Sequence, residues 1–202
     1  MEKMTLFNGA AALQGGDPMI LSLPNQQLQW YPMRVTYNRE MKVQASFLSF
    51  GIESFIPMRY EFVTDGDDCG RRLVPAVHNL IFVRSTRDII TNLKHSYEVF
   101  EPLRYIVSNS VTDGGFPKIL TVRDRDMENF IRACRVGADI EYLRYDPFLD
   151  KPGQRVRVIN GKFAGVEGVV KRIRKNKRVV VMISGVTAVM LNSIPYTWLE
   201  KI

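Results

Sequence analysis

Alternating apolar and polar positions mark a set of strands in the C-terminal quarter of the chain. Val156 and Val158 alternate with arginines, which is the period-2 pattern of a half-buried strand. Asn160-Gly161 then supplies a turn dipeptide, and the valine-rich runs 169–170 and 179–181 favour further strands. The segment 153–183 therefore predicts consecutive short strands that form a small SH3-like barrel.

The residues before this segment alternate between helical and strand patterns. Val43, Phe47 and Phe50 recur at i, i+4 and i+7, the spacing of one helix face, and Gly51 is placed to end that helix. The predicted helices cover 39–50, 87–95 and 123–136, and the predicted strands cover 29–35, 53–57, 58–64, 71–76, 77–83 and 103–107. Pro32 argues for an edge position or a bulge in the first strand, whereas the near-continuous apolar run 77–83 favours a central one. This order predicts an α+β fold.

Composition shifts divide the chain into four parts. We expect a flexible N-terminal tail over 1–28, with a candidate edge strand at 19–23, and a first domain over 29–136. A linker over 137–151 and a second domain over 152–202 follow. The chain has 46% apolar residues, which is enough for one ordinary domain and one small one. No apolar run reaches the roughly 18 residues of a membrane span, so we expect no membrane partner and a cytoplasmic protein.

The net charge of +7 is unevenly distributed along the chain. Residues 151–202 hold 11 Lys and Arg against 2 acids, a balance of +9, so the rest of the chain carries −2. Six cations lie within eight positions: Lys171, Arg172, Arg174, Lys175, Lys177 and Arg178. This run is compatible with a solvated hairpin face and with a surface that binds phosphates.

Residue patterns typical of catalysis are absent from the sequence. Neither His78 nor His95 lies in a metal-binding or nucleophile–base spacing, and no phosphate-binding glycine loop occurs. Cys134 falls on the apolar side of a predicted helix, as expected of a core thiol. We therefore predict a protein that is not an enzyme and has no catalytic, cofactor or metal site.

A resemblance to a known family appears in the C-terminal segment. The sequence GQRVRVINGKFAGVEGVV resembles a KOW motif, whose matching positions here are Gly153, Gly161, Phe163, Gly165 and Gly168. The closing run from Ser184 to Ile202 resembles the end of a NusG C-terminal domain. KOW modules occur in ribosomal proteins and elongation factors as well, so this motif alone indicates nucleic-acid machinery.

The first domain resembles the NusG N-terminal domain. Trp30-Tyr31 matches the pair that opens that domain, and Gly51-Ile52 with Phe55-Ile56-Pro57 matches a following strand. His78 and Leu80 stand where the family has proline and tyrosine. These departures indicate a diverged member of the family. The run 37–42 resembles the sequence of specialised antiterminators that act on surface-polysaccharide operons. The resemblance implies an antiparallel sheet with flanking helices.

This resemblance implies contacts with RNA polymerase and nucleic acid. The clamp helices of the polymerase would be bound by Val77, Leu80 and Phe82, and Leu80 would have to be exposed. Thr91 and Asn92 would add a second, polar contact with the polymerase on the opposite side of its cleft. DNA or nascent RNA would meet Arg34, Arg39 and Lys42, besides the six cations above. The function implied is transcription elongation and antitermination, with a ribosomal protein or termination factor as a possible partner of the second domain.

Two other classes of function remain open from the sequence. A KOW-type RNA-binding or ribosome-associated protein would use the barrel as its working part, and an enzyme with an appended barrel is the third class. The first-domain resemblance argues against the ribosome-associated protein, because that class does not need such a domain.

Overall fold

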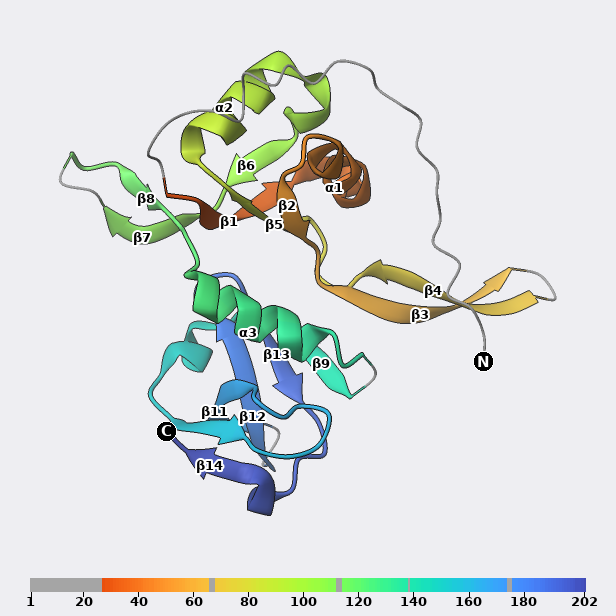
Figure 1. Ribbon diagram of the computed structural model, residues 1–202, viewed down its shortest axis with the longest axis vertical. Coiled ribbons are helices and arrows are strands. Elements are labelled where there is room, and N and C mark those ends of the chain that lie inside the picture. Colours follow the sequence, from red (N-terminus) through yellow and green to blue (C-terminus); the bar gives the residue numbers. More distant parts are fainter. Residues whose placement is uncertain (1–26, 66–67, 112–113, 138, 174–175) are drawn as a thin grey trace.

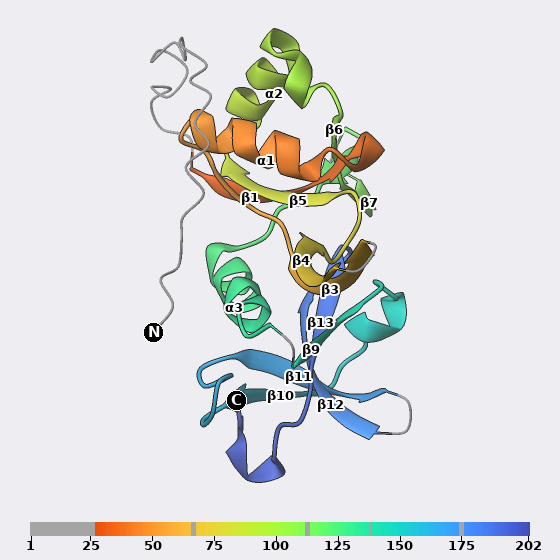
Figure 2. The ribbon, with the colours of Figure 1, turned by 90° about the vertical axis from the view of Figure 1, so that its right-hand side faces the viewer.

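The computed structural model describes residues 27–65, 68–111, 114–137, 139–173 and 176–202. An upper body of sheet and helices and a lower sheet are stacked, and helix α3 (Asp124–Cys134) lies between them (Figures 1 and 2). The predicted tail and the candidate strand at 19–23 fall largely or wholly outside the described residues. The α+β fold predicted from the sequence is confirmed.

The upper body is built on an antiparallel sheet of strand order β2-β5-β1-β6. Its strands are β1 (Gln29–Val35), β2 (Glu53–Phe55), β5 (Leu80–Ser85) and β6 (Leu103–Tyr105). Helices α1 (Glu40–Ser49) and α2 (Arg87–Ser96) cover one face, where Met33, Phe47, Ile81 and Leu93 are fully buried. Helix α3 covers the other face, where Trp30 and Phe82 meet Phe130.

The helix ends follow from local sequence. Helix α1 ends before Gly51, which adopts a φ of +68° that favours glycine. Helix α2 begins after Thr86, whose side chain accepts a hydrogen bond from the Ile89 backbone N–H at 3.2 Å. Short 3-10 turns lie at η2 (Thr36–Asn38) and η3 (Glu98–Phe100).

Two hairpins leave the upper body. The longer pairs β3 (Met58–Asp65) with β4 (Asp68–Pro75) and projects away from the core, and the shorter pairs β7 (Val107–Val111) with β8 (Pro117–Ile119) (Figure 1). The two strands of the longer hairpin end and begin within two residues of each other, at Asp65 and Asp68.

The lower body is a six-stranded antiparallel sheet of order β14-β10-β11-β12-β13-β9. Its strands are β9 (Ile140–Leu143), β10 (Gln154–Val158), β11 (Glu167–Ile173), β12 (Asn176–Ile183), β13 (Thr187–Leu191) and β14 (Leu199–Lys201), with turns η4 (Pro147–Asp150) and η5 (Tyr196–Trp198). The strands predicted for the second domain are therefore present. Strand β9 lies within the segment expected to be a linker, and it pairs with β13 at the edge of this sheet.

The KOW glycines have different structural roles. A Cβ on Gly168 would lie 2.8 Å from the Val180 carbonyl oxygen, so a side chain there would separate β11 from β12. Gly161 has a φ of +75° and lies against the Trp198 ring. Phe163 between these glycines is buried.

Two local expectations about the upper sheet are wrong. Pro32 lies in a central strand, between β5 and β6, and is buried. The Pro32 carbonyl oxygen accepts a hydrogen bond from the N–H of Ile106, one residue past the end of β6. Proline has no N–H to donate, and at Pro32 this missing donor falls where the hydrogen-bond ladder between β1 and β6 ends. The apolar run that we expected to pair from residue 77 begins as β5 only at Leu80, because Asn79 turns the chain with a φ of 60°.

Candidate interaction site

Helix α3 joins the two bodies through an apolar face. Met127, Phe130 and Ala133 are fully buried on it, and they belong to one core cluster with Val181 and Ile183 of β12. The same cluster includes Trp30 and Phe82 of the upper sheet. The helix is therefore packed on both sides, and the two bodies share a continuous core.

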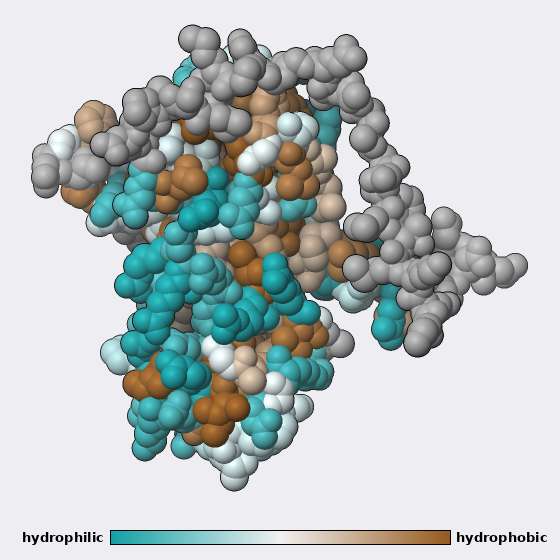
Figure 3. Space-filling view, viewed as in Figure 1, coloured by the Kyte–Doolittle hydropathy of each residue, from teal (hydrophilic) through white to brown (hydrophobic). Residues whose placement is uncertain are grey.

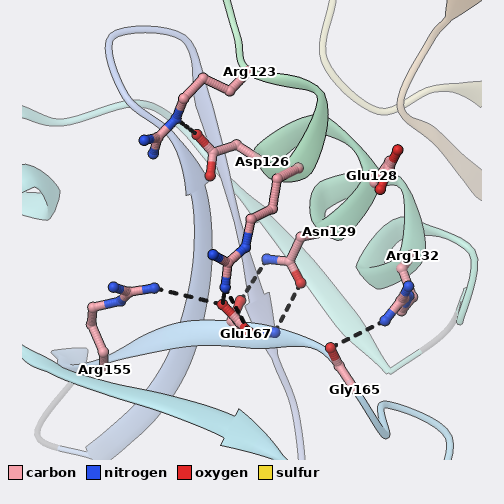
Figure 4. Close-up of a pocket in the computed structure, with 9 residues that line it drawn as sticks. Arg123, Asp126, Glu128, Asn129, Arg132, Arg155, Gly165 and Glu167 are labelled. Carbon is pink, nitrogen blue, oxygen red and sulfur yellow. Dashed lines mark hydrogen bonds and ion pairs between the residues drawn. The ribbon is translucent and has the colours of Figure 1, made fainter. Parts of the chain in front are cut away.

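Arg125 and Asn129 of α3 form a polar clasp with Glu167 of β11. Figure 4 shows Asn129 of the helix facing Glu167 of the strand. The Asn129 amide donates to the Glu167 backbone carbonyl at 2.7 Å and accepts from the Glu167 backbone N–H at 2.8 Å. The Arg125 guanidinium donates to the Glu167 carboxylate at 2.9 Å. Arg132 donates to the Gly165 carbonyl at 3.2 Å, one turn further along the helix.

The Glu167 carboxylate is the electrostatic centre of the clasp. Arg157 of β10 donates to it at 2.8 Å, and Arg155 approaches to 3.5 Å. The hydrogen bond from Arg157, followed by the charge of Arg125, holds the pKa of Glu167 below its usual value. The stability that this ionised group contributes is present above the ordinary glutamate pKa and is lost as the pH falls through the lowered pKa.

An Asn129→Ala variant should unfold more easily than the natural chain. It leaves two backbone groups of Glu167 without their partners, so we expect a loss of about 1–3 kcal/mol in the free energy of unfolding. Urea denaturation measures this loss. Glu128→Ala, on the adjacent exposed position, is the matched control and should change little; equal losses in the two variants would contradict the clasp.

An apolar groove lies between the β3–β4 hairpin, the end of α3 and strand β9. Its volume is about 640 Å³, and Phe55, Tyr60, Phe62 and Leu73 are among its lining residues. Tyr60 and Phe62 are 64% and 68% exposed, unusually high for large apolar side chains on one strand face. Apolar side chains gather beside α3 near the centre of the face seen in Figure 3.

Two contacts fix the walls of this groove. The Arg71 guanidinium lies 4.8 Å from the centre of the Phe62 ring on the neighbouring strand. The Tyr142 hydroxyl of β9 donates to the Met58 carbonyl at 3.2 Å, which ties the lower sheet to the base of the hairpin. Cys134 at the end of α3 is buried, and burial raises the pKa of its thiol to about 12, as for a core thiol.

The five residues expected to bind polymerase are not brought together. Leu80 and Phe82 are 1% and 0% exposed because α3 covers their face of the sheet, so the expected exposure of Leu80 is wrong. Val77 is half-buried near the groove. Thr91 and Asn92 lie on α2, across the sheet, where the Thr91 hydroxyl donates to the Arg87 carbonyl at 2.8 Å.

The cations expected to bind nucleic acid lie in two regions. Arg34, Arg39 and Lys42 are exposed around the end of β1 and the start of α1. On the β11–β12 hairpin Arg172 and Lys177 are exposed and stand opposite each other, and Arg178 is half-buried. Arg174 and Lys175 lie outside the described residues. 

Lys171 does not share the exposed hairpin face. It is 7% exposed, and its ammonium donates to the Lys151 carbonyl. The prediction of an exposed phosphate contact at Lys171 is therefore wrong, because strand alternation turns this side chain toward the η4 segment.

Sequence reasoning missed both the clasp and the groove. The alternation of Met58, Tyr60 and Phe62 was a visible signal for one apolar hairpin face. The partnership of Asn129 with Glu167 had no local signal, because the two residues are far apart in the chain. Within the described ranges, no helix is long and apolar enough to cross a membrane and no group of three or more His, Cys, Asp or Glu is placed to hold a metal ion.

Comparison with known proteins agrees with the two-part architecture. A family model described as "Transcription termination factor nusG" matches residues 28–131, and a KOW motif model matches residues 152–182. Among solved structures, one titled "Domain interaction in Thermotoga maritima NusG" is 21% identical, covering 87% of this chain and 98% of that chain with a TM-score of 0.41. A search of curated proteins found no significant match. Because the first model matches more than half of the residues, the chain belongs to the NusG family.

Proposed function

We propose that this chain is a transcription elongation factor that binds RNA polymerase through its N-terminal domain and counteracts pausing or termination. The family match over residues 28–131, followed by a KOW motif, supports a role in transcription. The apolar groove beside the β3–β4 hairpin is the observation that carries the polymerase contact. Binding that favours the elongating state of the polymerase would produce the effect without chemistry.

The groove is suited to a helical partner. Tyr60, Phe62 and Leu73 form one exposed face of a two-stranded hairpin, and Phe55 lies at its inner end. An amphipathic helix places apolar side chains into such a groove, and aromatic residues are frequent anchors at protein interfaces. We assign the clamp-helix contact to this groove instead of to Leu80 and Phe82, which are buried. Val77 directly follows Ala76, which lines the groove.

The nucleic acid of the elongation complex would meet the exposed cations. Arg34, Arg39 and Lys42 form the contact proposed in the first domain, and Arg172 and Lys177 form the one in the second. Arg172 and Lys177 stand opposite each other, so their positive charges repel in the free protein. A phosphate bound between them would relieve this repulsion. A ribosomal protein or a termination factor is the proposed partner of the second domain. We further propose that this chain acts in the cytoplasm, on the transcription of surface-polysaccharide operons.

A Tyr60→Ala/Phe62→Ala variant should bind core RNA polymerase at least ten-fold more weakly than the natural chain. Removing two exposed aromatic anchors takes away contact area without opening a core cavity, so the melting temperature should stay nearly constant. Fluorescence anisotropy with purified polymerase measures the affinity, and single-round transcription past a pause site measures the effect on elongation.

The matched control uses the opposite face of the same hairpin. Glu61 and Arg72 stand opposite each other in the register of β3 and β4, are exposed, and are not among the residues that line the groove. A Glu61→Ala/Arg72→Ala variant should bind the polymerase normally. Unchanged binding of the aromatic variant, or equal weakening in both, would refute the groove as the contact.

A further inference from the structure

A pocket rich in arginine lies between α3 and the lower sheet, beside the polar clasp (Figure 4). Its volume is about 350 Å³, a size typical of sites for small molecules. Four arginines line this arginine pocket: Arg123 just before α3, Arg125 and Arg132 on α3, and Arg155 on β10. None of its lining residues lines the apolar groove, so the two sites are separate.

Positive charge is left over where the strands meet the helix. Arg125 and Arg157 approach the Glu167 carboxylate at 2.9 and 2.8 Å. Arg155 approaches the same carboxylate at 3.5 Å, so three guanidinium groups share one acid. Glu200 adds a second carboxylate, but it pairs with Arg157 alone, at 3.8 Å. The two acids therefore neutralise two of the three arginines.

Arg132 adds a further positive charge to the pocket. It donates to the Gly165 carbonyl at 3.2 Å, and within the described ranges it forms no ion pair with a carboxylate. A guanidinium group has five N–H donors, so most of those on Arg132 remain available to a ligand. Glu128 also lines the pocket, but its side chain points away from Glu167 (Figure 4).

The fourth arginine is held by a weak pair. Arg123 contacts Asp126 at 2.7 Å, and the two side chains are 85% and 40% exposed. Exposed ion pairs contribute little to stability because water screens them. A ligand of higher charge can therefore take the Arg123 guanidinium from Asp126 at small cost.

A smaller hollow of about 120 Å³ adjoins the arginine pocket. Asn129, Arg155 and Glu167 line both spaces. On the strands the hollow is lined by Val169 and Met182, which are half-buried. It therefore offers apolar surface next to the cations, where a flat ring attached to a phosphate chain has room.

We propose that the arginine pocket binds a ligand with several linked phosphate groups, either an inorganic polyphosphate or a nucleoside polyphosphate. The planar guanidinium group donates two parallel hydrogen bonds to a phosphate, and several phosphates in one ligand match several arginines. Because these arginines come from α3 and from β10, the ligand binds when the helix is packed on the lower sheet and stabilises that packing. The site is independent of the proposed polymerase and nucleic-acid contacts.

Isothermal titration calorimetry with the full chain tests the ligand class. The probes are tripolyphosphate, GTP, inorganic phosphate and citrate, each in metal-free buffer. Tripolyphosphate, GTP or both should bind at least about ten-fold more tightly than phosphate and citrate, since each additional charged hydrogen bond contributes a factor of this size. Tighter binding of GTP than of tripolyphosphate would identify a nucleotide, and the reverse or equality an inorganic polyphosphate. Citrate or phosphate that binds as tightly as both would overturn the proposal, as would the absence of binding.

Two variants test whether the ligand bridges the two bodies. Arg132→Gln removes a guanidinium from the helix and Arg155→Gln removes one from the sheet, and each should weaken tripolyphosphate binding by about ten-fold or more. Arg144→Gln is the matched control, because Arg144 is exposed and lines neither space. Its affinity should stay unchanged. Weakening in only one of the first two variants would overturn the bridging role, and equal weakening in all three would indicate unspecific attraction and overturn the site.

The melting temperature gives a second measurement. At a tripolyphosphate concentration of about 100 times Kd, the melting temperature of the natural chain should rise by about 5 °C or more. Arg155→Gln at the same concentration should retain only about half of this rise, because a ten-fold weaker ligand stabilises about half as much. Arg144→Gln should show the full rise. No rise in the natural chain would contradict stabilisation of the packed state by the ligand.

Discussion

A Leu80→Asp variant should lose about 5 kcal/mol of its free energy of unfolding. Leu80 is 1% exposed in the core that α3 forms with the upper sheet. Truncation of a buried leucine costs about 2–5 kcal/mol, and a carboxylate without a partner adds to that loss. Urea denaturation followed by circular dichroism measures the change. Any loss of polymerase binding in this variant would reflect unfolding and not a missing contact.

His78→Asp provides the control for this substitution. His78 lies two residues earlier, is exposed in the turn before β5, and receives the same new charge. Its stability should change by less than about 0.5 kcal/mol, as for most surface substitutions. Similar losses in the two variants would contradict the burial of Leu80 under α3.

A Phe130→Ala variant should destabilise both domains together, by about 3–5 kcal/mol. The Phe130 ring is fully buried, with its centre 5.9 Å from that of Phe82 and 6.4 Å from that of Phe55. Its core cluster continues into the lower sheet, so the cavity weakens the packing of α3 against both bodies.

The two tryptophans allow each domain to be followed separately. Trp30 lies in β1 of the first domain and Trp198 in η5 of the second, so variants that keep one of them report on one domain each. In both backgrounds Phe130→Ala should shift the urea midpoint in the same direction. Phe62→Ala, which removes a ring that is 68% exposed, should leave both midpoints in place. A shift confined to the Trp30 reporter would show that the second domain unfolds independently of α3.

Local patterns predicted the elements well where the determinant lies within a few residues. The recurrence of Val43 and Phe47 predicted α1, and both side chains are fully buried on it. Gly51 ends that helix as expected, and the valine runs of the second domain form β11 and β12. These features depend on helix and strand periodicity and on glycine conformation, which the sequence shows directly.

The errors arose where a distant segment decides the outcome. The alternation of side chains along the strand correctly placed Leu80 and Phe82 on the opposite face from their neighbours. It gives no information, however, on which helix covers the face that holds Leu80 and Phe82. Pro32 tolerates a central strand because β6 ends beside it, and the segment around Ile140 became β9 because β13 offers an unpaired edge. Whether the groove and the exposed cations bind polymerase and nucleic acid remains a prediction that the proposed experiments address.

The pairing of β9 with β13 has a consequence for any partner of the second domain. Only residues 135–139 separate the end of α3 from β9, so an extended chain spans no more than roughly 20 Å between them. A tether this short keeps the lower sheet near α3 at an effective concentration in the millimolar range or above. The contact between them can therefore persist even if its intrinsic affinity is low. A partner that binds the same face of the sheet must compete with this intramolecular concentration, so its apparent affinity for the whole chain should be lower than its affinity for the sheet alone.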